Sequence, residues 1–161
     1  MLAIAMLINA TIGVPLWQGV RAGMTADELK SVRPNVRHLS LSEYATLDYP
    51  KGCTYVDSQK IPLDLVDFNV CYALNDRGVR DVVLYANTLS NPIQSLKPFL
   101  VGRYGHPELE QCQEFFDNRK CDVVFRHGGV QIRVSTDGMR RVPSNSTEIH
   151  YQPIDDPEAS F

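Results

Sequence analysis

Four cysteines fall into two pairs, each placed symmetrically about a turn, and this spacing limits the possible folds more than any other feature. Cys53 and Cys71 flank a turn region between two strand-like runs, and Cys112 and Cys121 flank a second short loop. Directly opposed residues of an antiparallel hairpin are roughly 4.5–5.5 Å apart at Cα, a separation that suits a disulfide. We therefore predict disulfides 53–71 and 112–121, each within a hairpin.

Other states of the four cysteines stay open at this point. Four cysteines allow three pairings, and four buried free thiols would be typical of a cytosolic protein. A structural zinc site has little support, because no two cysteines have the C-x-x-C spacing. If the disulfides form, the chain folds in an oxidising compartment.

Alternating apolar and polar residues predict strands through most of the chain. The run 65–74 alternates strictly, with Val66, Phe68, Val70 and Tyr72 on one face. Residues 36–47 are ambiguous, and residues 136–146 are expected to form a polar loop. The expected strands are 53–61, 65–74, 79–86, 109–115, 120–126, 129–135 and 147–152.

Two helix starts interrupt the strands. Thr25 and Glu28 have the spacing of a capping box, and Pro34 stops the helix, which predicts a helix over 26–33. For the second helix, we prefer Ser95 as the cap, because Pro98 then falls in the first turn, where its missing N–H has no partner to lose. The competing start is at residues 91–92, and Gly105 ends the helix.

These elements predict an α+β fold in which two short helices pack on one face of a mostly antiparallel sheet. Each helix has one apolar stripe to bury, so a single sheet face accommodates both. The order of elements is similar in the two halves and suggests two tandem helix-plus-strands repeats. The expected units are an apolar leader (1–16), a first repeat (17–88), a second repeat (89–152) and a polar tail (153–161).

The first ten residues carry no charge and are nearly all apolar. This run is too short to span a bilayer, so no transmembrane segment is expected. It is similar to the core of a secretory signal, although a positively charged segment before it is missing. A buried first strand and an uncleaved anchor are the alternatives.

Composition and motifs exclude several classes of function. A net charge of −3 lacks the basic footprint of a nucleic-acid-binding protein. The four histidines show no metal-ligand spacing, and neither a catalytic motif nor a glycine-rich phosphate loop is present. We therefore expect no enzyme activity, no metal and no cofactor.

The strongest candidate for a binding site is one face of the sheet. If Val130, Ile132 and Val134 face the helices, the residues between them form a polar surface, as is usual for one side of an antiparallel sheet. A solvated face without a partner is the simpler interpretation. Acidic residues on the expected strands, such as Asp81 and Asp122, would form a catalytic pair only if a particular register between the strands is assumed. The candidate binding residues are Asp67, Asn69, Arg126, Gln131, Arg133, Glu148 and His150.

The stretch Gly23–Leu29, with the sequence Gly-Met-Thr-Ala-Asp-Glu-Leu, resembles the helix start of the SmpA/OmlA (BamE-like) family and of the related β-lactamase-inhibitor-protein fold. Tyr104-Gly105-His106-Pro107 is similar to the helix ending of that family in the second half. This chain departs from the pattern in lacking a glycine before Pro34 and a lipobox cysteine after the leader, so no lipid anchor is expected. The resemblance implies a non-catalytic envelope protein that binds another protein.

The sequence therefore predicts a periplasmic or secreted module of the bacterial envelope that acts in protein binding or assembly. The module could act as an inhibitor, and its expected partner is another envelope protein or a peptide. The alternatives are a small hydrolase or transferase with an unrecognised site, and a carrier of a small ligand. The enzyme hypothesis predicts a cleft in which titratable side chains converge. The carrier hypothesis predicts an apolar cavity of a few hundred Å³.

Overall fold

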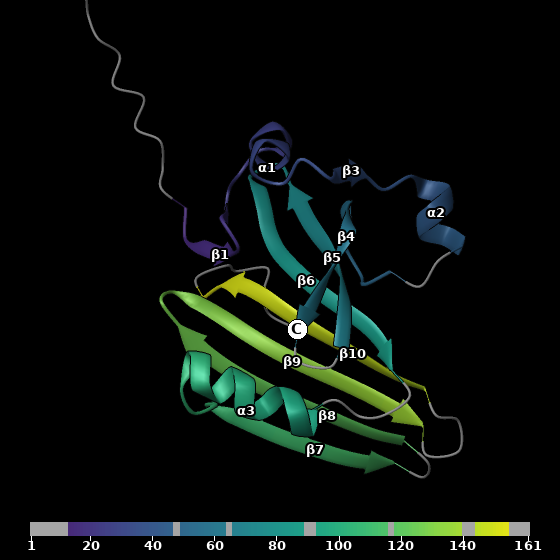
Figure 1. Ribbon diagram of the computed structural model, residues 1–161, viewed down its shortest axis with the longest axis vertical. Coiled ribbons are helices and arrows are strands. Elements are labelled where there is room, and N and C mark those ends of the chain that lie inside the picture. Colours follow the sequence, from purple (N-terminus) through teal and green to yellow (C-terminus); the bar gives the residue numbers. More distant parts are fainter. Residues whose placement is uncertain are drawn as a thin grey trace, which may run out of the picture.

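The computed structural model describes residues 13–46, 49–63, 66–88, 93–115, 118–139 and 144–154, most of which lie in strands. The strands are Pro15–Trp17 (β1), Val20–Arg21 (β2), Val36–His38 (β3), Tyr55–Leu63 (β4), Val66–Asn75 (β5), Gly78–Thr88 (β6), Leu109–Phe115 (β7), Asn118–His127 (β8), Val130–Met139 (β9) and Ser144–Pro153 (β10). Eight strands form one antiparallel sheet in the order β3-β4-β5-β6-β10-β9-β8-β7, and β1 pairs with β2 in a small ribbon (Figure 1).

Three short helices accompany the sheet within the described ranges: Ala26–Val32 (α1), Leu41–Thr46 (α2) and Ile93–Tyr104 (α3). The first helix packs near β3 and β6, and α3 packs on β8 in the other half of the sheet (Figure 1). The helix α2 belongs to the segment Leu39–Cys53, whose ends pack on Val56 and Val83 in a separate apolar cluster. Because strand side chains alternate between faces, this cluster lies on the side opposite α1 and α3.

The expected α+β class, with two short helices packed on one face of the sheet, is wrong. The chain is mostly β, and it has a third helix in a segment that lies on the other side of the sheet. Polar stretches account for much of the difference. Residues 136–139 and 144–146, expected in a loop, extend β9 and β10, because their backbones pair with each other and with neighbouring strands. Composition does not reveal this pairing.

The sheet joins two four-stranded meanders through their last strands. The strands β3 to β6 form one meander and β7 to β10 the other, and β6 pairs with β10 at the centre, with Leu84 opposite Ile149. One apolar core runs along the side of α1 and α3. It takes Leu29 and Leu96 from the two helices and side chains from both meanders, among them Leu84 and Phe125. Both halves therefore bury their apolar residues in the same core.

The start of α1 is the predicted capping box. The N–H of Glu28 donates to the hydroxyl of Thr25 at 3.3 Å, and the N–H of Thr25 donates to the Glu28 carboxylate at 2.8 Å. The helix ends at Val32, one residue earlier than predicted, with Arg33 as its C-cap before Pro34. The sequence alone thus located this helix.

The start predicted for α3 is wrong. The helix begins at Ile93, so Ser95 lies inside it and Pro98 falls in its interior rather than in its first turn. The helix therefore lacks the hydrogen bond that a residue with an N–H would donate to Gln94. Burial of Leu96 and Leu100 in the core stabilises the helix despite this loss. Its predicted end is confirmed, because Gly105 has a φ of +86° and donates to the carbonyl of Val101.

Both predicted disulfides are present, Cys53–Cys71 and Cys112–Cys121. Cys112 lies directly opposite Cys121 on β7 and β8, as the hairpin argument required. Cys53 lies two residues before β4. This disulfide therefore links the segment that leads into β4 to β5, and it does not join two directly paired strand residues. Two disulfides are typical of proteins that fold outside the reducing cytosol.

The ends of the chain lie mainly outside the described residues. The apolar run 1–10 and most of the tail 153–161 fall there, whereas Leu16 and Trp17, at the junction of the expected leader and first unit, are buried in β1. In the described part of the chain, no helix combines the length and apolar character needed to cross a bilayer.

Candidate functional site

Alternate residues of four neighbouring strands form a polar face on the side of the sheet opposite α1 and α3. On β9, Ile132 and Val134 are buried in the core, whereas Arg133 between them points to the other side. The same alternation applies to β6, β8 and β10. This polar face consists of Asp81, Asp122, Arg126, Gln131, Arg133, Ser135, Glu148, His150 and Gln152.

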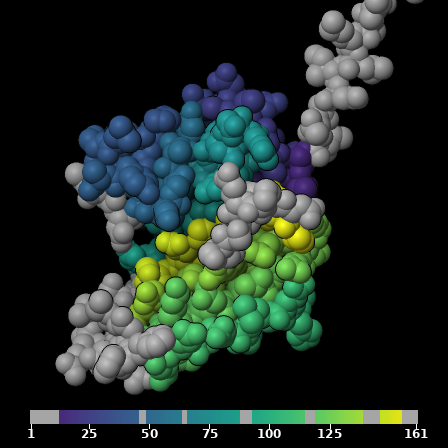
Figure 2. Space-filling view, turned by 180° about the vertical axis from the view of Figure 1, so that it is seen from behind, coloured from purple at the N-terminus to yellow at the C-terminus, as the bar shows by residue number. Residues whose placement is uncertain are grey.

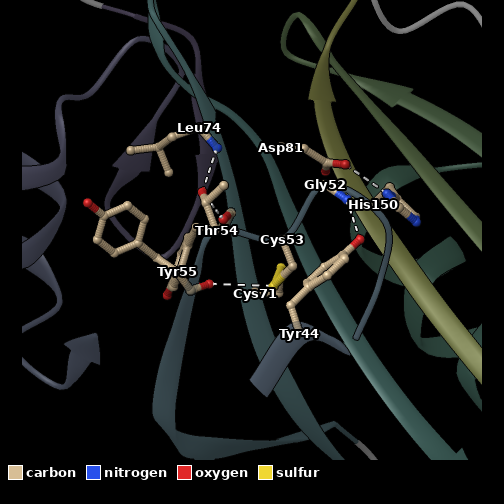
Figure 3. The surroundings of a disulfide bond; sticks show 10 residues. Tyr44, Gly52, Cys53, Thr54, Tyr55, Cys71, Leu74, Asp81 and His150 are labelled. Carbon is tan, nitrogen blue, oxygen red and sulfur yellow. Dashed lines mark hydrogen bonds and ion pairs between the residues drawn. A yellow bond between two sulfur atoms is a disulfide. The ribbon is translucent and has the colours of Figure 1, made fainter. Parts of the chain in front are cut away.

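A histidine held between two carboxylates is the centre of this face. In His150, Nδ1 lies 2.8 Å from Oδ2 of Asp81, and Nε2 lies 3.0 Å from Oε2 of Glu148. Asp81 is nearly buried and also accepts a 3.0 Å hydrogen bond from Nε2 of Gln152. Figure 3 shows Asp81 and His150 near Gly52 and the Cys53–Cys71 disulfide.

The two carboxylates keep His150 positively charged at neutral pH. Burial alone would lower the pKa of His150, but the hydrogen bonds and negative charges of Asp81 and Glu148 outweigh it and raise the pKa to about 9. Both ring nitrogens therefore carry protons that are donated to carboxylates. An imidazolium in this state has no lone pair with which to accept a proton, so this geometry does not make His150 a general base.

A second ion-paired group lies beside the histidine. Nε of Arg133 donates to Oδ1 of Asp122 at 3.1 Å, and Nη2 of the same guanidinium lies 3.0 Å from that oxygen. The hydroxyl of Ser135 donates to the same oxygen at 2.7 Å. At the end of the face, Arg126 lies 3.3 Å from the carboxylate of Glu108. The face is thus a set of oriented charges of both signs rather than a single-sign patch.

The residues proposed from the sequence lie on one side of the sheet but do not form one cluster. Only Glu148 and His150 contact each other in a described hydrogen bond, and Arg133 pairs with Asp122 instead. Asp67 and Asn69 share the same side by alternation, yet they lie on β5, with β6 between them and β10. They are therefore neighbours of the polar face rather than part of its central cluster.

Sequence reasoning missed the roles of Asp81, Gln152 and Tyr49. Asp81 is an acid within the apolar run 79–86, and its position two residues before Val83 gives the side of the sheet it occupies. This signal was available, but pairing it with His150 required knowing that β6 and β10 are neighbours, 69 residues apart in sequence. Nothing in the local pattern around Tyr49 placed it on this side.

The described residues of the segment Leu39–Cys53, called the covering segment, cover the part of this side that lies over β4 to β6. The ring of Tyr49 meets the ring of Tyr85 edge to face, with centroids 6.0 Å apart, and Cys53 is bonded to Cys71. Figure 2, seen from behind, shows this blue segment beside the yellow and green surface of β8 to β10. The polar face therefore begins where the covering segment ends.

The described residues also line pockets elsewhere. One of about 390 Å³ lies between the start of α1 and the β5–β6 turn, with His38, Thr54 and Asp76 in its walls. Another of about 270 Å³ lies between the β1–β2 turn and the end of α3, with Trp17 and Arg103 in its walls. Both linings mix polar and apolar side chains, unlike the apolar cavity expected of a carrier. Within the described ranges, no group of three or more metal-ligating side chains converges.

Comparison with known proteins found no matching family model, curated protein or solved structure. The resemblance to the SmpA/OmlA family and the β-lactamase-inhibitor-protein fold therefore remains an expectation from residues 23–29 and 104–107.

Proposed function

We propose that this chain is a non-catalytic module of the bacterial periplasm that binds another envelope protein or a peptide through the polar face. The observation that carries this proposal is the set of oriented ion pairs over β6 to β10. Complementary charges at protein interfaces give specificity and steer association. Arg126 is exposed, and the side chain of Glu148 keeps 38% of its accessible surface, so partner groups can reach them.

Charge-reversal variants with matched net charge test this proposal. The variant Arg126→Glu with Arg133→Glu alters the polar face, and Lys97→Glu with Arg103→Glu alters α3 on the other side by the same charge. Each purified protein is immobilised and exposed to periplasmic extract, after circular dichroism has shown that it is folded. We expect a partner retained by the wild type and by the α3 variant to be lost from the polar-face variant.

Equal retention by both variants would contradict binding through this face. If no protein is retained by the wild type, the result would favour the enzyme or carrier hypothesis. Because the two variants have the same net charge, a general effect of charge on adsorption would appear in both.

A further inference from the structure

A small pocket lies at the border between the covering segment and the polar face. Its side walls include Tyr49 of the covering segment, Tyr85 and Asn87 of β6, and Ser146 and Glu148 of β10. Its volume is about 130 Å³, well below the roughly 300 Å³ at which pockets for drug-sized ligands begin. This size suits the end group of one side chain rather than a whole small molecule.

Two tyrosine rings make one wall of this pocket aromatic. The Tyr49 and Tyr85 rings are inclined at 66°, so the two rings present surfaces in different directions around the same space. Burial raises the pKa of Tyr85 to about 12, so this ring stays neutral in the physiological range. Aromatic faces attract ammonium and guanidinium groups through the ring quadrupole.

The lining also includes a carboxylate, that of Glu148, which lies beside Tyr85 on the neighbouring strand. Oε2 of Glu148 accepts from His150, and within the described ranges Oε1 accepts no hydrogen bond. The cluster of Asp81, His150 and Glu148 carries two negative charges and one positive charge, and no other side chain in the described ranges forms an ion pair with it. One negative charge of the cluster therefore has no partner among the described residues. The exposed fraction of Glu148 shows that solvent reaches it.

Besides His150, the described cations beside this site are paired with carboxylates of their own. Arg37 interacts with the hydroxyl of Tyr49, but its guanidinium lies 2.8 Å from the carboxylate of Glu43 and is paired there. Arg133, on the next strand, is paired with Asp122. The pocket therefore combines an aromatic wall with one available negative charge.

We propose that this pocket binds the ammonium or guanidinium end of a lysine or arginine side chain presented by the protein partner. This inference rests on the proposed function, because it assigns the chemistry of the partner residue that meets the polar face. The carboxylate of Glu148 provides the counter-charge, and the tyrosine rings contact the apolar stem and the delocalised cation.

A model cation tests the pocket without the partner. Propylguanidinium is added to the ¹⁵N-labelled full chain, and amide chemical shifts are followed by NMR, with the uncharged propylurea as a matched probe. We expect saturable shifts for residues of the pocket with propylguanidinium and not with propylurea. Because single exposed ion pairs and cation–π contacts are weak, Glu148→Gln and Tyr49→Leu should each weaken binding by roughly two- to fivefold.

Glu110→Gln is the control variant, because it removes the same charge from β7 on the opposite side, where Glu110 pairs with Lys97. It should bind the probe as the wild type does. Equal responses to the two probes, no shifts at the pocket, or wild-type affinity in both pocket variants would overturn the inference. Amide spectra of each variant show whether it is folded, and Tyr49→Leu tests the site independently if Glu148→Gln perturbs His150.

The two proposals fail separately. If the pocket binds propylguanidinium but no partner is retained on the polar face, the cation site stands and the proposed function is wrong. If a partner is retained and the pocket ignores the cation, only the pocket inference is wrong.

Discussion

Buried charges in this sheet are stabilised by specific partners, and two such groups lie on opposite sides of it. On the core side, the carboxylate of Asp57 is almost fully buried and accepts from Arg33 at 2.6 and 3.1 Å. On the polar face, His150 lies between Asp81 and Glu148. A buried charge that loses its partner is strongly destabilising, so both groups give measurable consequences at the level of one residue.

Replacing Asp57 with Asn should lower the free energy of unfolding by about 3 kcal/mol, because the guanidinium of Arg33 is left without a counter-charge. Urea unfolding at pH 7 measures this change. Asp67→Asn is the matched control on the neighbouring strand, where the exposed carboxylate should be worth less than about 0.5 kcal/mol. If both substitutions lower the free energy of unfolding by the same amount, the buried pair of Asp57 and Arg33 stabilises the fold no more than an exposed carboxylate does.

The free energy of unfolding should fall as the pH rises, because the stabilising contribution of protonated His150 is lost. Its pKa is about 9 in the folded chain, against about 6.5 when unfolded, so the folded state binds the proton more tightly. The contribution of His150, about 3 kcal/mol, is fully present below pH 6.5 and is lost as the pH rises through 9. We expect the stability difference between the wild type and His150→Gln to shrink over this window in urea unfolding. An NMR titration of the His150 ring with a midpoint near 6.5 would contradict this.

At the scale of elements, the two disulfides act on different parts of the fold. Cys112–Cys121 links paired residues of β7 and β8, at the edge of the sheet. Cys53–Cys71 ties the covering segment to β5, where Tyr49 also packs on Tyr85. Loss of the first affects a hairpin, whereas loss of the second affects the segment that carries Tyr49, which lines the pocket beside Glu148.

Replacing each cysteine pair with serines should therefore give similar losses of stability but different local effects. Chain entropy for separations of 9 and 18 residues predicts a loss of about 2.5 to 3 kcal/mol in each case. Hydrogen exchange should accelerate around Leu39 and Cys53 only in the variant without Cys53–Cys71. Unchanged exchange there would mean that packing alone holds the covering segment.

Elements with strong local signals were predictable from the sequence, and elements that depend on distant partners were not. The capping box of Thr25, the strict alternation of β5 and the symmetric cysteines are local features, and all were interpreted correctly. The continuation of β9 into residues 136–139 depends on pairing with β8 and β10. For the same reason, the side of the sheet on which His150 lies was predictable, but its contact with Asp81 was not.

At the scale of the whole molecule, the central pairing of β6 with β10 makes the two meanders one structural unit. Ile149 is fully buried on β10, opposite Leu84 of β6, and both belong to the core that also includes Trp17 and Phe125. Neither meander has a core of its own on that side. The polar face likewise takes Asp81 from one meander and His150 from the other, so the candidate site exists only when both are folded together.

The two halves should therefore unfold in a single transition. Amide signals of β4 and β5 report on the first half and those of β7 and β8 report on the second, so their midpoints in urea should coincide. Ile149→Ala creates a cavity at the junction and should lower both midpoints together, by an amount that corresponds to about 3 kcal/mol. Val32→Ala, at an exposed position of α1, should move neither by more than about 0.5 kcal/mol. Separate midpoints, or a response of only one probe to Ile149→Ala, would mean that each meander is stable alone and that the polar face is assembled from two independent units.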